Sequence, residues 1–203
     1  MSIRYNSNHV DKILICEREC LFKDIEGRYL LKVKLKNNFA DTLTIAMMNP
    51  SKADKKCSDD TVNKVISFVY EMNSCEDSLV KNIGFINFVN VFPVYEPNSG
   101  NVRDKLEQII ANGKLNSMQN KNKIAFETAI SGSQNVVLAW GDVPSKVKAK
   151  YHNHEAIMMY ELLKSYGLEN NTYLFKYEEF EQILTNKKRP RHPARNNLRL
   201  MLR

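Results

Sequence analysis

Short apolar runs alternate along this chain with segments of helical spacing. Four runs have the length and composition of buried strands: 42–48, 82–92, 135–139 and 172–176. Between them, apolar residues recur at helical spacing after Asp60, which we expect to be an N-cap, over 102–111, 119–131 and 145–165, and in a charged helix over 177–185. This alternation predicts an α/β fold with three layers (α/β/α) and a mostly parallel central sheet.

The first part of the chain departs from this alternation. Residues 1–15 show no clear period, and we expect them to be weakly structured. Two runs, 21–24 and 29–35, flank an expected turn over 25–28, and Leu31, Val33 and Leu35 alternate with lysines. We expect an N-terminal antiparallel hairpin at the edge of the sheet, in a single domain that spans residues 1–203.

Polar or aromatic side chains stand where the expected strands end. Asn49 and Pro50 stop the first run, Asn90 lies near the end of the second after Asn87, and Trp140 follows the third. Ligands of open parallel sheets bind at the carboxyl ends of the strands, so these residues are site candidates. The alternatives are ordinary ones: Asn-Pro is a good turn, and most tryptophans serve core packing.

The excess charge is confined to the end of the chain. The net charge is +7, from 30 basic and 23 acidic residues. Seven of the basic residues and none of the acidic ones follow Asn186, so the rest balances at 30 − 7 = 23 against 23. A basic segment over 187–203 predicts a polyanionic partner such as nucleic acid; a solvated tail is the alternative.

Cysteine spacing and hydropathy exclude several other classes of protein. Cys16, Cys20, Cys57 and Cys75 form no C-x-x-C pair, and His152 and His154 would face different sides of a helix. We therefore expect no metal and no cofactor, with reduced thiols in a cytoplasmic protein. No apolar run approaches the roughly 20 residues that span a bilayer, so no membrane association is expected.

Read together, the strand-end blocks resemble a known family. Asn49-Pro50-Ser51-x-Ala53-Asp54, Asp59-Asp60-Thr61, Asn90-x-Phe92, Ala139-Trp140-Gly141 and Pro190-Arg191-His192-Pro193 occur in the order seen in DUF1643, a family of uncharacterised bacterial and phage proteins. The resemblance covers roughly residues 18 to 196.

Several blocks are also similar to the uracil-DNA glycosylase superfamily. That resemblance implies a glycosylase-like fold, in which Asn49 positions water and His192 stabilises the departing base as the catalytic pair. It implies that Asn90, Asn87, Pro50, Ser51 and Trp140 contact the base. It also implies that Lys188, Arg189, Arg191 and Arg195 bind DNA phosphates.

The chain differs from that superfamily where catalysis would need help. Position 49 has an amide instead of a carboxylate, Ala194-Arg195-Asn196 follows the His-Pro pair, and the cysteine spacing of the iron–sulfur branch is missing. The resemblance therefore implies a pseudo-glycosylase with weak or absent uracil excision that binds DNA, an acidic DNA-mimic glycosylase inhibitor, or both. The alternative is an active monofunctional DNA glycosylase for uracil or for a mismatched or modified base. In either case we expect the loops at 49–51, 90–93 and 190–195 to converge on one cleft.

Overall fold

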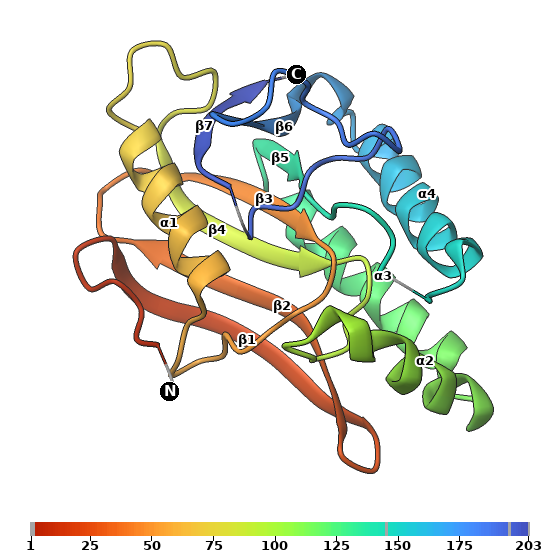
Figure 1. Ribbon diagram of the computed structural model, residues 1–203. Helices are drawn as coiled ribbons and strands as arrows, with labels where there is room; N and C mark the ends of the chain where they lie inside the picture. Colours follow the sequence, from red (N-terminus) through yellow and green to blue (C-terminus); the bar gives the residue numbers. More distant parts are fainter. Residues whose placement is uncertain (1–2, 145, 195, 203) are drawn as a thin grey trace.

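A seven-stranded sheet in the order β1-β2-β4-β3-β5-β6-β7 forms the centre of the computed structural model, which describes residues 3–144, 146–194 and 196–202 (Figure 1). The strands are β1 (Val10–Phe22), β2 (Ile25–Leu35), β3 (Asp41–Met47), β4 (Ile83–Asn90), β5 (Asn135–Leu138), β6 (Thr172–Tyr177) and β7 (Leu198–Leu202). The expected runs at 42–48, 82–92, 135–139 and 172–176 are therefore all strands.

Only the middle of this sheet is parallel. β4, β3, β5 and β6 run parallel to one another, whereas β1, β2 and β7 are joined to their neighbours antiparallel. The expectation of a mostly parallel sheet is wrong, and the fold is a mixed α/β one. The reason is that antiparallel neighbours need no crossover helix: β1 and β2 are joined by a tight turn, and the chain returns from β6 to β7 through residues 178–197, which contain no helix in the part that the structure describes.

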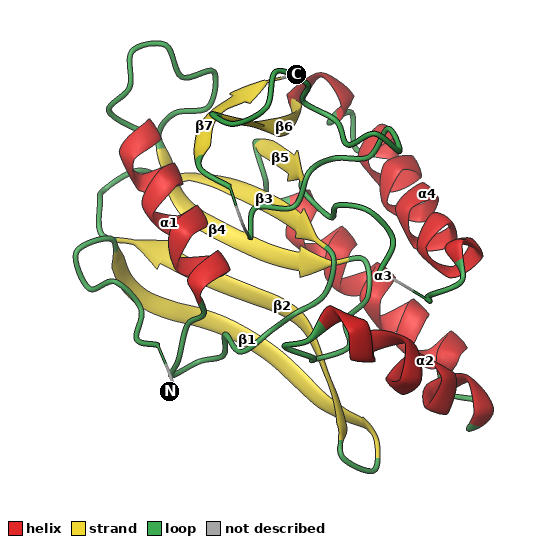
Figure 2. Cartoon of the chain, in the orientation of Figure 1, coloured by secondary structure: helices red, strands yellow, loops and turns green. Residues whose placement is uncertain are grey.

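Helices cover both faces of the sheet (Figure 2). The helices are α1 (Asp60–Met72), α2 (Val102–Ala111), α3 (Leu115–Ser131) and α4 (Ala149–Ser165), with short 3-10 turns at Ser99–Asn101 and Glu169–Asn171. The apolar side of α1 packs on one face, with Leu43 and Phe88 of the sheet. α2, α3 and α4 pack on the other, around Val89 and Phe126. Among the helices that the structure describes, none combines the length and apolar character needed to cross a membrane.

The N-terminal hairpin is present but is displaced from the expected position. β1 already begins at Val10, inside the region expected to be weakly structured, and the turn lies at Lys23 and Asp24 instead of 25–28. Lys23 adopts a φ of 49° there. Gly27 belongs to β2, where its missing Cβ lets Leu21 pack closely: a Cβ would lie 3.1 Å from Leu21 Cδ1.

Two local expectations also change. The N-cap of α1 is Asp59 instead of Asp60, because the Asp59 carboxylate accepts a hydrogen bond from the Val62 N–H (2.8 Å). The charged segment after Tyr177 forms turns instead of a helix, and the chain then returns as β7 beside β6. The end of the basic C-terminal segment, Leu198–Leu202, is thus part of the sheet.

The order of the parallel strands creates a crevice between β3 and β5. The chain leaves β3 toward α1 on one face, and leaves β5 toward α4 on the other face. Adjacent strands whose connections depart to opposite faces leave a crevice at their carboxyl ends, where ligands bind in open α/β sheets.

Candidate functional site

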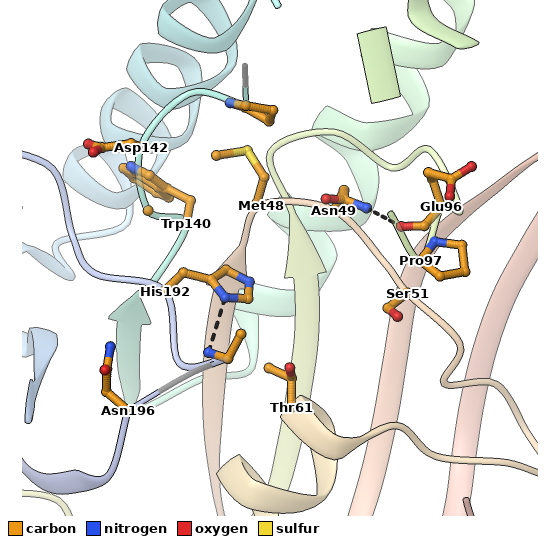
Figure 3. A pocket seen from close by; sticks show the side chains of 13 residues that line it. Met48, Asn49, Ser51, Thr61, Glu96, Pro97, Trp140, Asp142, His192 and Asn196 are labelled. Atoms are coloured by element: carbon orange, nitrogen blue, oxygen red, sulfur yellow. Dashed lines mark hydrogen bonds between the residues drawn. The ribbon is translucent and has the colours of Figure 1, made fainter. Parts of the chain in front are cut away.

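A pocket of about 400 Å³ opens in this crevice (Figure 3). Its walls come from five segments: the β3 end, the start of α1, the loop after β4, the loop after β5 and the C-terminal loop. The residues that line it are Met48, Asn49, Ser51, Thr61, Glu96, Pro97, Trp140, Gly141, Asp142, Pro144, His192, Ala194 and Asn196. Segments far apart in the sequence, around Asn49 and around His192, therefore meet at one site.

Asn49 fixes the turn that ends β3. Its side-chain Nδ2 donates to the carbonyl oxygens of Glu96 (2.7 Å) and Pro50 (3.1 Å). Both amide hydrogens are therefore engaged within the protein, and the Oδ1 atom is left as the acceptor that a ligand or a water molecule can use.

The loop after Asn49 is held by three side chains beneath it. The consecutive carbonyls of residues 52, 53 and 54 accept hydrogen bonds from Tyr95 Oη (2.7 Å), Arg28 Nη1 (2.6 Å) and Tyr5 Oη (2.6 Å) respectively. Arg28 is fully buried, and burial lowers its pKa, while the nearby Asp59 carboxylate opposes that effect. Because each of these carbonyls has its own donor, the loop that follows Ser51 in the pocket wall is held in one conformation before any ligand binds.

His192 lies on the opposite wall from Asn49, beside Trp140, with its ring directed into the pocket (Figure 3). The pKa of His192 is lowered from 6.5 to about 4, chiefly because burial removes the ring from water. The nearby Asp59 carboxylate opposes this lowering, and the Lys64 charge adds to it. The ring is therefore neutral at pH 7. Its Nδ1 accepts the Ala194 N–H (3.2 Å), which assigns the remaining ring hydrogen to Nε2. The pocket thus contains a neutral imidazole N–H donor.

Gly141 allows the C-terminal loop to approach the end of β5. It adopts a φ of +76°, and a Cβ on it would lie 2.9 Å from the Cβ of His192. Its N–H donates to the Pro190 carbonyl (2.7 Å). The position of the imidazole therefore depends on a residue without a side chain at 141.

Lys64 of α1 holds the same loop from the other side. Its ammonium donates to the carbonyls of Pro193 (3.4 Å), Ala194 (3.1 Å) and Asn196 (3.4 Å). These bonds use the three donors of the amine, so Lys64 acts as a clamp on the loop that carries His192.

Arg189 connects the start of this loop to α4. Its guanidinium lies against His152 Nδ1 (Nη1 at 2.7 Å) and donates to Asn153 Oδ1 (3.0 Å). The pKa of His152 is lowered from 6.5 to about 4, chiefly by burial and also by the Arg189 charge, so Nδ1 is free to accept. The fully buried His152 ring also packs edge-on against Trp140, with 6.3 Å between ring centroids.

The other cations of the expected phosphate-binding set are placed differently from one another. Arg191 stacks on Phe180 (3.9 Å to the ring centroid) and donates from Nε to the Gln182 carbonyl (3.1 Å). Lys188 is exposed. Arg195 lies outside the described residues. The guanidinium groups of Arg189 and Arg191 therefore contact other protein groups, which leaves fewer of their N–H donors for phosphates.

The expected base-contacting residues divide into two groups. Ser51 and Trp140 line the pocket, while Pro50, Asn87 and Asn90 are not among its lining residues. Asn87 donates to Thr44 Oγ1 (3.2 Å) and to the Ala129 carbonyl (3.0 Å), which ties β4 to β3 and α3. Asn90 is fully buried at the end of β4, and neither Nδ2 nor Oδ1 of its side chain has a hydrogen-bond partner among the described residues.

The two carboxylates of the pocket have partners of their own. Glu96 binds Lys105 (2.9 Å) and the Asn98 N–H (2.8 Å); burial alone would raise the pKa of Glu96, but these donors lower it. Asp142 accepts a hydrogen bond from Thr185 Oγ1 (2.7 Å). Within the described ranges, no three His, Cys, Asp or Glu side chains are grouped so as to hold a metal ion.

Sequence reasoning did not assign a positioning role to Lys64, His152 or Gly141. Lys64 resembles any other lysine on an amphipathic helix, and His152 resembles an ordinary helical histidine. Gly141 gave a usable signal, since a glycine directly after a strand end often marks a close approach of two backbones. Its partner, 51 residues further along at His192, could not be identified in that way.

Comparison with known proteins places the chain in a family. No curated protein and no solved structure matches it. The model of the family described as "Protein of unknown function (DUF1643)" matches residues 28–194, which include every wall of the pocket up to Ala194. The chain belongs to the DUF1643 family.

Proposed function

We propose that this protein binds nucleic acid over the pocket and takes one base into it, with weak or absent excision of uracil. The observation that carries the proposal is the meeting of Asn49, Trp140 and His192 in one pocket at the crevice between β3 and β5. An aromatic ring beside a hydrogen-bond donor and an acceptor suits a planar base with a polar edge.

His192 supplies the donor that base recognition or base departure requires. When an N-glycosidic bond breaks, negative charge develops on the base oxygens, and an N–H aimed at such an oxygen lowers the barrier. The neutral ring already carries a hydrogen on Nε2, so it can donate without first gaining a proton. It can stabilise developing negative charge only as a dipole, which is a weaker effect than that of a cation.

Asn49 explains why excision should be weak. Its Oδ1 can orient a water molecule but has no useful basicity. The pocket carboxylates do not replace it, because Glu96 is paired with Lys105 and Asp142 is bound to Thr185. The pocket therefore offers recognition of a base, with little help for the attacking water or for the positive charge on the sugar.

The second candidate is an active DNA glycosylase for a mismatched or modified base. The preformed Nε2–H donor of His192 favours it, because a base that leaves easily needs that donor more than it needs a carboxylate.

Single-stranded or damaged DNA is the proposed partner in both cases. An acidic protein that mimics DNA is a further proposed partner for the basic C-terminal loop. The free thiols of all four cysteines support a reducing compartment such as the cytoplasm.

Binding and excision are tested together on single-stranded and duplex oligonucleotides that contain uracil or a panel of modified bases. We expect binding at low salt, and no more than trace abasic product at enzyme excess. His192→Ala should weaken binding, whereas His154→Ala, which removes an exposed imidazole on α4, should not. Efficient base release that His192→Ala reduces by about 100-fold or more would establish the second candidate instead. Absence of binding to every oligonucleotide at low salt would refute both.

A further inference from the structure

Six exposed lysines lie in the connections that follow β3 and β5, close in sequence to pocket residues but not among those that line the pocket. Their side chains make none of the contacts described above; Lys150 Nζ lies 5.0 Å from the centroid of the Tyr151 ring. Three follow β3, namely Lys52, Lys55 and Lys56, and are here called the β3 lysines. Three follow β5, namely Lys146, Lys148 and Lys150, and are here called the β5 lysines. In the described part of the chain none of the six forms an ion pair. Arg189 and Arg191, by contrast, are engaged with His152, Asn153, Phe180 and Gln182.

The β3 lysines point outward from a loop whose acids point inward. Asp54 accepts hydrogen bonds from the N–H groups of Lys56 (2.7 Å) and Cys57 (2.8 Å) and also binds Arg18 (3.3 Å). Asp59 accepts from the N–H groups of Lys52 (3.3 Å), Ala53 and Val62. Although the loop contains acids, their charge faces backbone donors, so the surface of the loop presents lysine.

The β5 lysines begin two residues after Pro144, which lines the pocket, and continue into the first turn of α4. The acid that faces them is Glu107 of α2. It is already bound to Arg103 (3.0 Å and 3.3 Å), with Lys148 as a weaker neighbour. The other acid of this loop, Asp142, accepts a hydrogen bond from Thr185. Thr185 is neutral, so Asp142 keeps its charge, but three lysines against this one carboxylate leave an excess of positive charge here as well.

The two lysine groups follow different walls of the pocket: Lys52 is next to Ser51, and Lys146 comes two residues after Pro144. The β3 lysines belong to the connection that leads to α1 on one face of the sheet, and the β5 lysines to the connection that leads to α4 on the other face. The pocket opens between these connections, at the ends of β3 and β5. A strand that contacts both Lys52 and Lys146 would therefore run past the pocket, since Ser51 and Pro144 both line it.

We propose that a single-stranded nucleic acid crosses the pocket between the β3 lysines and the β5 lysines, which bind its phosphates on either side of the base that enters the pocket. This proposal rests on the proposed function and adds the path and the strandedness of the ligand. A single strand fits because its bases need not be unpaired before one of them turns into a pocket. The described residues of the 190–197 loop offer no large exposed apolar side chain that could fill the gap left in a duplex.

The test measures binding of fluorescent dT12 and rU12 by anisotropy as a function of salt concentration. Three variants of equal charge are compared with the parent. Lys52→Gln/Lys55→Gln/Lys56→Gln and Lys146→Gln/Lys148→Gln/Lys150→Gln remove the two groups. The control, Lys12→Gln/Lys123→Gln/Lys164→Gln, removes three exposed lysines on β1, α3 and the far end of α4.

Each lost phosphate contact to a single strand should reduce the slope of log affinity against log salt by about 0.7. We therefore expect each group variant to reduce the slope by about 2, and the control variant to leave it near the parental value. Affinity for oligothymidylates should rise with length until both groups are reached, and level off within about 4–16 nucleotides.

The outcomes separate this inference from the proposed function. Parental binding that depends on His192 but is unchanged in both group variants would overturn the crossing path and leave the proposed function standing. Equal losses of affinity in the group variants and in the control variant would overturn the path. They would show that the net positive charge alone attracts the strand, as it would attract any polyanion, including an acidic protein. Equally tight binding of a 12-base-pair duplex, with the same dependence on both groups, would overturn the single strand. No parental binding at low salt would refute the proposed function together with this inference.

Discussion

Gly141 determines where the imidazole of His192 can lie. Its φ of +76° is one that L side chains rarely adopt, and an added Cβ would meet His192 Cβ at 2.9 Å. The loop cannot move away freely, because the Pro190 carbonyl is bound to the Gly141 N–H and Lys64 holds residues 193, 194 and 196. Residue 141 is therefore the place where a single methyl group can test the architecture of the site.

We predict that Gly141→Ala lowers the free energy of unfolding by about 1–3 kcal/mol, because it combines a strained φ with a close contact. Nucleic-acid binding should also weaken, because His192 must shift. Gly132→Ala is the matched control: Gly132 ends α3 at a φ of −109° with open space around its Cβ position. Urea unfolding measures the free energy of unfolding of both variants. Equal stabilities of the two variants would show that the contact between residue 141 and His192 is loose.

At the scale of elements, α1 does more than cover the sheet. Thr61 at its start lines the pocket, and Lys64 one turn later binds the loop that carries His192. β7 pairs with β6 and so fixes the far end of the C-terminal loop, which contacts the end of β5 through the Pro190 carbonyl and the Gly141 N–H. The site therefore depends on two elements, α1 and β7, that are joined through the C-terminal loop.

We predict that Lys64→Met releases this loop while α1 stays folded. The change removes a charged donor from three carbonyls, and hydrogen bonds to charged groups contribute about 1.5–3 kcal/mol each to stability when well formed. Hydrogen exchange at the Ala194 N–H should become at least about tenfold faster, whereas Lys123→Met on α3 should leave that exchange unchanged. Unchanged protection of residues 192–197 in Lys64→Met would contradict the clamp.

The elements that the sequence predicts well are those with an uninterrupted period. α2 occupies 102–111 as expected, and β3 ends where Asn49-Pro50 follows it. β1 escaped prediction because its pairing with β2 is broken by four register shifts, which destroy the alternation of side chains. β7 was hidden because its short apolar stretch, Leu198–Leu202, lies inside a basic segment.

The same contrast holds for the site. Strand-end position indicated Asn49 and Trp140, because the ends of parallel strands meet at one edge of a sheet, and the resemblance added Ser51. Strand-end position could not show that Asn87 lies outside the pocket, with a threonine on β3 and a carbonyl of α3 as its partners. It also could not indicate the internal use of Arg189 and Arg191, since a cation and its neutral partner leave no pattern in the sequence.

At the scale of the whole molecule, two neutral histidines connect the site to stability. The pKa values of His152 and His192 are both lowered from 6.5 to about 4, chiefly by burial. Between these values the unfolded chain binds more protons than the folded one, so stability decreases as the pH falls through this window. Protonation of His152 would also set its charge against that of Arg189 and remove the Nδ1 acceptor.

We predict that the free energy of unfolding falls between pH 6.5 and pH 5, with His152 contributing up to about 1.4 kcal/mol per pH unit. The half-buried His192 should contribute less. Glu155 acts in the opposite direction, because burial raises its pKa, so the informative quantity is the difference between variants. His152→Gln should flatten the dependence, and His154→Gln, an exposed position, should not. Parallel curves for the parent and His152→Gln would contradict the lowered pKa of His152.

Entry of a base into the pocket can be measured directly, because the only tryptophan of the chain lines that pocket. The measurement is Trp140 fluorescence during a titration with unlabelled dT12, compared with anisotropy of labelled dT12 under the same conditions. We predict a change in Trp140 emission that saturates at the concentration where binding saturates, and that is lost in His192→Ala. Saturated binding with unchanged Trp140 emission would contradict entry of a base, because the nucleic acid would then be held elsewhere on the molecule.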